Sequence, residues 1–228
     1  MNSLKRTARI AGILILAIAV AGPIGLLVPT SLIVPGDAAA TANNIIASET
    51  LFRIGMAAQA VLFLLEISLP IVLYVLLKPV NKTLSMIAAT ARLAMGTVQG
   101  INVFNHLAAL QLLGGGDYMA GLASDQVQAL VLFFLNLHIQ GELIWGLFFA
   151  LHLLLLGYLV SKADYFPGYL GAVLGVASLC YLLTGFGRIL LPGLEQLYVL
   201  IGYSSIIELA FPIWLLIKGV KEQPAANT

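Results

Sequence analysis

The chain has 228 residues, of which 61% are hydrophobic and only 9% are charged. Soluble domains carry about 25% charged residues, so this composition excludes a water-exposed surface over most of the protein. The net charge of +1 provides no basic stripe for phosphates, which excludes a nucleic acid partner, and the single cysteine, Cys180, excludes an intrachain disulfide.

Six apolar stretches follow one another along the chain, each longer than the roughly 17 residues that cross the hydrocarbon of a bilayer. Their approximate ranges are 10–28, 51–77, 84–113, 137–160, 170–191 and 197–217. No segment alternates with the period of two that a membrane strand requires. We therefore predict an all-α polytopic membrane bundle of about six transmembrane helices, formed by a single integral membrane domain over residues 1–228.

The first stretch has two possible readings, because Lys5, Arg6 and Arg9 precede it as in a signal peptide. The stretch is nevertheless longer than the roughly 7–15 residues of a signal core, and no small-x-small cleavage site follows before Pro29. We expect a retained first helix.

The connections between the stretches differ in length. Pro79 and Pro167 mark two short turns, at which we expect helices to end. In the loop after the first stretch, Asp37 is predicted to cap a short helix over residues 38–47. Ser124 and Asp125 are predicted to open a half-polar helix that lies at the outer interface before the chain turns inward.

Lys and Arg residues give the orientation, since cytoplasmic loops are enriched in them. With the N-terminus inside, only Arg53 falls outside, and Arg92 and Arg188 lie within spans. The inner side then holds Lys5, Arg6, Arg9, Lys78, Lys82, Lys162, Lys218 and Lys221. Both termini are therefore predicted to be cytoplasmic.

Three segments carry a resemblance to a known family. They are Leu32–Ala42 (LIVPGDAAATA), Tyr74–Lys82 (YVLLKPVNK) and His152–Tyr158 (HLLLLGY). Together they resemble DUF4386, a bacterial family of membrane proteins without an assigned function, and the similarity covers nearly the whole chain. The resemblance implies a multi-pass protein of the bacterial cytoplasmic membrane, and it implies no activity, substrate or site.

Charged side chains within the spans are the candidates for chemistry, because each one is costly in hydrocarbon. At about 100° per residue, one stripe of the third helix carries Arg92, Gln99, Asn102 and His106. One stripe of the fourth helix carries His138, Glu142, Trp145, Phe149 and His152. The two helices run antiparallel, and a rise of about 1.5 Å per residue places Arg92 level with His152 and His106 level with His138.

The same depth comparison predicts two polar tiers in the bundle. The inner tier comprises Glu66, Arg92, His152 and Glu208. The outer tier comprises Asn102, His106, His138, Glu142 and Arg188. The structural interpretation is a buried ion pair of Arg92 with Glu66 or Glu208, and a pair of Glu142 with Arg188. The functional interpretation is a protonation or substrate site in the inner tier and the lining of an outward-open pocket in the outer tier.

We expect no cofactor. Two bis-histidine haems need four histidines and the chain has three, and one haem between His106 and His138 would lie at interfacial depth. A metal on Glu66, Glu208 and His152 has suitable ligand types, but Arg92 in the same layer would repel a cation. No catalytic sequence motif is present, which favours a protein that is not an enzyme.

The function that fits these features best is a carrier or channel-like protein for a small solute or ion, using the intramembrane carboxylates. Pro70 and Pro212 lie four residues after Glu66 and Glu208, and broken helices at these sites would support it. No repeat relates the first three helices to the last three, which weakens an inverted-repeat transporter. The alternatives are a non-catalytic accessory or sensory subunit of a larger membrane complex and an intramembrane enzyme acting on a lipid or quinone. The expected partners are membrane lipids, with other membrane subunits or further copies of this chain as alternatives.

Overall fold

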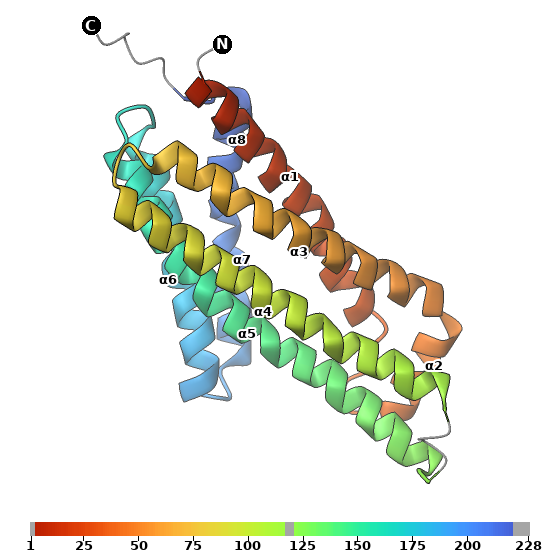
Figure 1. Ribbon diagram of the computed structural model, residues 1–228. Coiled ribbons are helices and arrows are strands. Elements are labelled where there is room, and N and C mark those ends of the chain that lie inside the picture. The colour runs from red at the N-terminus through yellow and green to blue at the C-terminus, as the bar shows by residue number, and fades with distance from the viewer. Residues whose placement is uncertain (1–2, 117–120, 221–228) are drawn as a thin grey trace, which may run out of the picture. The chain divides into compact units, whose positions relative to one another are not determined.

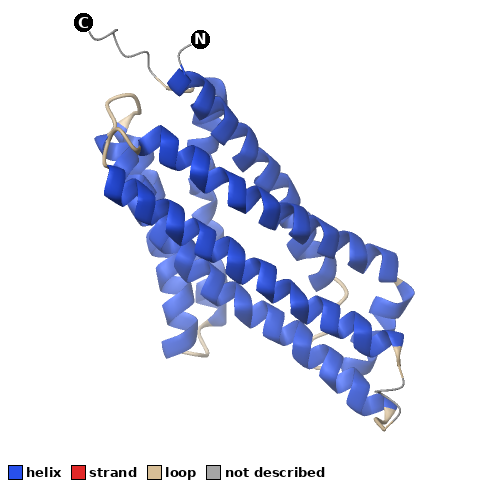
Figure 2. Ribbon diagram, viewed as in Figure 1, coloured by secondary structure: helices blue, strands red, loops and turns tan. Residues whose placement is uncertain are grey.

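The computed structural model describes residues 3–116 and 121–220, and helices make up most of this part of the chain (Figures 1 and 2). The α-helices are α1 (Ser3–Thr30), α2 (Ala38–Ala47), α3 (Glu49–Leu77), α4 (Lys82–Gly114), α5 (Ser124–Lys162), α6 (Gly168–Leu190), α7 (Glu195–Ser204) and α8 (Ala210–Ile217). A 3₁₀ segment, Ser205–Leu209, joins α7 to α8. The described ranges contain no strand, which confirms the all-α prediction. Lys221 lies outside them.

Five segments are long and apolar enough to cross a membrane, against about six predicted: α1, α3, α5, α6 and Glu195–Ile217. The missing one is α4, which has 33 residues but a lower apolar content. Polar residues of α4 are buried, with whole-residue exposed fractions of 5% for Arg92, 6% for Asn102 and 1% for His106. The helix therefore keeps these polar groups inside the protein. The same groups lower its mean hydropathy, so α4 is not among the five apolar segments.

Local sequence signals placed most helix ends correctly. Asp37 caps α2, because its carboxylate accepts a hydrogen bond of 2.8 Å from the amide of Ala40. The turn at Pro79 separates α3 from α4, and α6 begins directly after Pro167. The predicted change of direction after Ser124 was wrong, since α5 is one continuous helix of 39 residues. The segment Ser124–Lys162 contains no proline, so nothing in it interrupts the helix.

The described chain forms two compact units. Within the described residues, unit 1 comprises residues 3–17, 65–96 and 143–220, and unit 2 comprises residues 18–64, 97–116 and 121–142. The boundaries fall inside α1, α3, α4 and α5, so each of these helices contributes a segment to both units. The single integral membrane domain stays a prediction.

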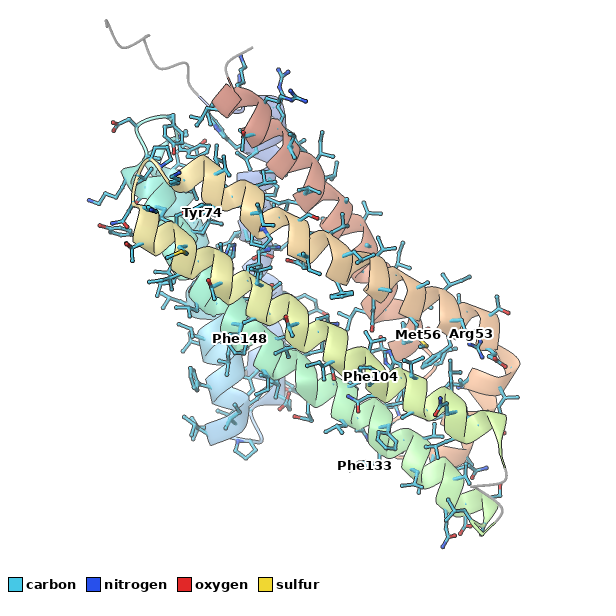
Figure 3. The ribbon with its side chains drawn as sticks, in the orientation of Figure 1. Arg53, Met56, Tyr74, Phe104, Phe133 and Phe148 are labelled. Carbon is cyan, nitrogen blue, oxygen red and sulfur yellow. The ribbon has the colours of Figure 1, made fainter. Side chains whose placement is uncertain are left out.

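Unit 2 packs α2 and parts of four long helices around an apolar core. The core residues are Leu32, Ile45, Phe52, Ala109, Leu110, Val131 and Leu135. On its surface, Phe104 and Phe133 are exposed by 66% and 57% and point away from the helices (Figure 3). Aromatic side chains this exposed are costly in water and suited to lipid. Arg53, at the beginning of α3, forms an exposed ion pair with Glu49 (Figure 3).

Unit 1 relies on close helix contacts. A Cβ atom added to Gly157 of α5 would lie 2.7 Å from the carbonyl oxygen of Gly171 in α6, so this crossing requires glycine. Nearby, the hydroxyl of Ser178 donates a 2.7 Å hydrogen bond to the carbonyl of Ala150. On α4, Gly96 allows close approach to α3, because its added Cβ would lie 3.1 Å from the Cβ of Glu66. This last contact positions the main polar cluster.

Candidate functional site

Glu66 of α3 and Arg92 of α4 form a buried, bidentate ion pair in unit 1. Nε of Arg92 donates to Oε2 of Glu66 at 2.6 Å, and Nη2 donates to Oε1 at 2.9 Å. The two side chains are exposed by only 6% and 3%. The guanidinium carbon also lies 5.3 Å from the centroid of the Phe149 ring on α5. The carboxylate thus occupies one edge of the arginine, and an aromatic ring lies against it.

Glu208 lies where the last predicted span is interrupted. Pro212 lacks the N–H that an α-helix would donate to the carbonyl of Glu208, and the amide of Ala210 bonds instead to the carbonyls of Ile207 and Glu208. The Oε1 atom of Glu208 is 3.4 Å from the hydroxyl of Tyr181 on α6. Its Oε2 atom is buried without a hydrogen-bond partner, and the carboxyl group is within electrostatic reach of Arg92 and Glu66.

His152 completes the predicted inner tier. Its Nδ1 atom is 2.8 Å from the carbonyl oxygen of Ala88, and because a carbonyl can only accept, Nδ1 carries the proton. Its Nε2 atom is buried without a partner, and Arg92 is close enough to interact with it electrostatically. The structure therefore brings Glu66, Arg92, His152 and Glu208 together in unit 1, and leaves one acceptor atom open on each of the last two.

Four residues of the predicted outer tier meet in unit 2, where α4 faces α5. The imidazoles of His106 and His138 stack with ring centroids 3.8 Å apart. The side-chain amide of Asn102 donates a 2.8 Å hydrogen bond to the carbonyl of His138, and Nδ1 of His138 donates to the carbonyl of Asn102 at 3.0 Å. On the same face of α5, Oε1 of Glu142 is 3.4 Å from Nε2 of His138. The Oε1 atom of Glu142 has no hydrogen-bond partner, so its approach to His138 is electrostatic rather than a hydrogen bond.

Arg188, the fifth residue assigned to the outer tier, belongs to unit 1. Its Nε atom donates a 3.0 Å hydrogen bond to Oε2 of Glu195, which begins α7. The Glu195 side chain is exposed by 61%, so the pair lies at the surface of the unit. The sequence did not indicate this partner, because Glu195 lies in a loop-to-helix boundary rather than in a span.

The structure gives the arrangement of the residues that were considered as metal or haem ligands. No group of three or more His, Cys, Asp or Glu residues in the described ranges is arranged to hold a metal ion. The stacked rings of His106 and His138 leave no space for an iron between them. That the protein takes no cofactor stays a prediction.

One polar contact of the site was missed from the sequence. Gln59 of α3 is 2% exposed and donates a 2.7 Å hydrogen bond to the carbonyl of Gly25, which ties α3 to α1 in unit 2. The Glu-to-Pro spacing noted in the sequence is part of a short shared pattern. The segments Leu64–Ile71 (LLEISLPI) and Ile206–Ile213 (IIELAFPI) both place a glutamate four residues before a proline. This shared pattern is the sequence signal that relates Glu66 to Glu208.

The fold is that of a multi-pass membrane protein. Its helical segments are long and apolar enough to cross a membrane, and both units keep polar clusters inside. A family model described as "Domain of unknown function (DUF4386)" matches residues 10–219, and the chain belongs to this family. A protein of Archaeoglobus fulgidus, described as an uncharacterized protein, is 27% identical over 168 residues, covering 73% of this chain and 85% of the relative. No solved structure matches the chain.

Proposed function

We propose that the protein is a proton-coupled membrane carrier for a small solute or ion, in which Glu208 takes up and releases the proton. One observation supports this most strongly: the buried Oε2 atom of Glu208 has no hydrogen-bond partner. A buried carboxylate with an unsatisfied oxygen is costly unless it is protonated or paired. Glu208 is therefore the described carboxyl group of unit 1 with the strongest physical reason to bind a proton.

The surroundings favour a proton over a metal ion. Arg92 lies within electrostatic reach of Glu208, and its positive charge repels a bound cation. The guanidinium donates hydrogen bonds to both oxygens of Glu66, and the interaction of Glu208 with Arg92 is electrostatic. A proton neutralises Glu208 without bringing a second full positive charge toward Arg92.

The backbone around Glu208 can support movement. A 3₁₀ segment within a membrane helix has weaker hydrogen-bond geometry than an α-helix and often marks a hinge. If Arg92 exchanges Glu66 for Glu208, the second glutamate gains a partner while the first is released to bind the proton. Two carboxyl groups around one arginine would thereby provide the two states that alternating access requires.

The direct test follows the carboxyl groups themselves. Infrared difference spectra of the protein in liposomes would record the C=O stretch of protonated carboxyl groups as the pH changes. We expect one titrating band that Glu208→Gln removes. The matched control is Glu195→Gln, because Glu195 is exposed and bonds to Arg188 away from the cluster. A band that persists in Glu208→Gln would refute the assignment.

Proton flux tests the carrier itself. Vesicles loaded with a pH-sensitive dye would report proton entry driven by a potassium gradient and valinomycin. We expect entry above that of protein-free vesicles, which Glu208→Gln abolishes and Glu195→Gln leaves intact. If the infrared band depends on Glu208 but the wild type conducts nothing, the carrier is rejected in favour of a sensory or accessory subunit.

A further inference from the structure

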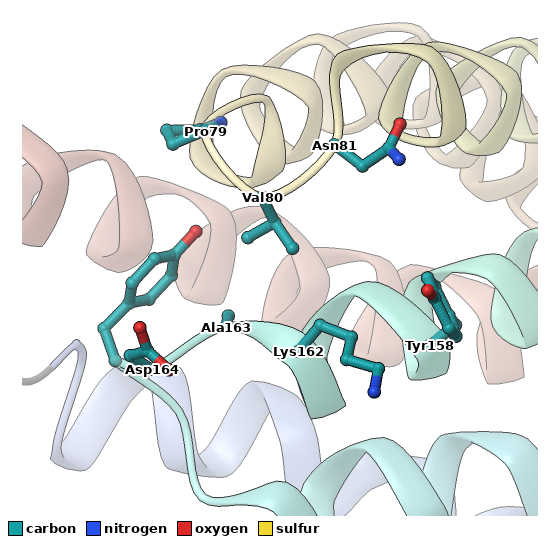
Figure 4. Close-up of a pocket in the computed structure, with 8 residues that line it drawn as sticks. Pro79, Val80, Asn81, Tyr158, Lys162, Ala163 and Asp164 are labelled. Carbon is teal, nitrogen blue, oxygen red and sulfur yellow. The ribbon is translucent and has the colours of Figure 1, made fainter.

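A polar pocket of about 370 Å³ lies where two turns of unit 1 meet (Figure 4). The α3–α4 turn contributes Val80 and Asn81, and the end of α5 with the following turn contributes Tyr158, Lys162, Asp164 and Tyr165. Small-molecule sites in proteins have volumes of about 300–1,000 Å³, so the pocket can hold a headgroup-sized ligand. It is separate from the cluster around Arg92, none of whose residues line it.

The cationic end of the pocket is Lys162. Its ammonium lies 5.9 Å from the centroid of the Tyr158 ring, one helical turn earlier, and it forms no ion pair within the described residues. On the facing turn, the side-chain oxygen of Asn81 accepts a 2.9 Å hydrogen bond from the amide of Leu84. That bond turns the oxygen inward to α4 and leaves the NH₂ group of Asn81 as a donor. Both groups suit a phosphate.

The anionic end is Asp164, which lies at the other end of the pocket from Tyr158 (Figure 4). The neighbouring Tyr165 ties the turn after α5 to α3, because its hydroxyl donates a 2.7 Å hydrogen bond to the carbonyl of Leu76 at the end of α3. Burial raises the pKa of Tyr165 to about 12, so the hydroxyl keeps its proton and this bond at any physiological pH. The pocket thus has a positive charge at Lys162 and a negative charge at Asp164, and the hydrogen bond of Tyr165 fixes the turn that carries Asp164.

We propose that this pocket binds a phosphoethanolamine group, with the phosphate on Lys162 and Asn81 and the ammonium on Asp164. The surrounding charges place the pocket at headgroup depth, since Lys78, Lys82 and Lys162 mark one predicted membrane face. A choline group lacks N–H donors for Asp164, and a glycerol group lacks its positive charge. The same chemistry occurs in a membrane lipid and in a soluble phosphoester.

Native mass spectrometry of the purified full-length protein would test the site with phosphatidylethanolamine, phosphatidylglycerol and phosphatidylcholine. We expect selective retention of phosphatidylethanolamine, and Lys162→Gln should weaken it about tenfold, the loss of one charge-assisted hydrogen bond. Asp164→Asn should remove the preference over phosphatidylglycerol. The matched control is Lys82→Gln, which removes the same charge at the position after Asn81 but outside the pocket lining.

Glycerophosphoethanolamine distinguishes the two sources of the ligand. If it displaces the lipid, and Lys162→Gln weakens its binding as well, the ligand includes soluble phosphoesters. If it does not compete, the pocket is a lipid site. Equal retention of the three lipids by the wild type, or equal effects of Lys162→Gln and Lys82→Gln, would overturn the proposal. Thermal unfolding of each variant would show that the exposed substitutions leave the fold intact.

Discussion

Removing Arg92 should destabilise the protein far more than removing Glu66, although the two residues form one ion pair. Arg92→Met leaves Glu66 buried at 3% exposure with no donor for either oxygen, beside a second carboxyl group at Glu208. Removal of one partner from a buried pair costs about 3–5 kcal/mol, and we expect a loss in that range. The cation–π contact with Phe149 is lost in the same variant.

Glu66→Gln should cost less, about 1–2 kcal/mol, because the amide oxygen still accepts one hydrogen bond from Arg92. Glu208 is also within electrostatic reach of Arg92 and can replace the missing charge. The variant that removes both carboxylates should therefore lose more stability than the sum of the single variants, since neither partner remains for the guanidinium. This non-additivity is the signature of two carboxyl groups sharing one arginine.

The assay is reversible unfolding in mixed micelles, with the free energy of unfolding measured for wild type, Arg92→Met, Glu66→Gln, Glu208→Gln and the double glutamine variant. The control is Glu66→Leu combined with Arg92→Met, which removes both charges and should fall within about 2 kcal/mol of wild type. Equal losses for Arg92→Met and Glu66→Gln, or strict additivity of the two glutamine substitutions, would refute the shared-arginine arrangement.

Three further outcomes are expected. Gly157→Ala should lower the free energy of unfolding by about 1–3 kcal/mol, because the added Cβ would lie 2.7 Å from a backbone atom of α6. The control is Gly175→Ala, which should change stability little because its added Cβ has no atom within 4 Å. Similar effects of the two substitutions would contradict the close crossing. His138→Leu should cost about 1 kcal/mol, because it removes the hydrogen bond from Nδ1 to the Asn102 carbonyl while that carbonyl keeps its helical partner within α4. The same unfolding assay measures this loss, and a neutral result would argue against the hydrogen bond of 3.0 Å. For Tyr165, folding raises the pKa from 10.0 to about 12, so the folded state holds the proton more tightly and stability should fall as pH rises from 10 to 12. Tyr165→Phe should lose this dependence, and an unchanged pH profile of unfolding would show that Tyr165 is not its source.

Much of the fold follows from residues close together in the chain. The length and polarity of each stretch determined the long helices to within a few residues, except at the starts of α1 and α5. Asp37, Pro79 and Pro167 determined local boundaries. The spacing of Arg92, Asn102, His106, His138 and His152 also determined which polar groups share a face. These properties depend only on the rise of about 1.5 Å per residue and the turn of about 100° of an α-helix, so they require no knowledge of tertiary structure.

Partner choice was decided by tertiary structure. Arg92 bonds to Glu66 because Gly96 lets α3 approach α4 closely, and no local pattern measures that distance. Arg188 bonds to Glu195, whose position depends on how α7 folds back along α6. The interruption at Glu208 likewise depends on tertiary packing, since Pro70 occurs in the same pattern within a helix that stays continuous. A sequence determines which polar groups must be satisfied within the membrane, whereas the packing of helices determines which group satisfies each one.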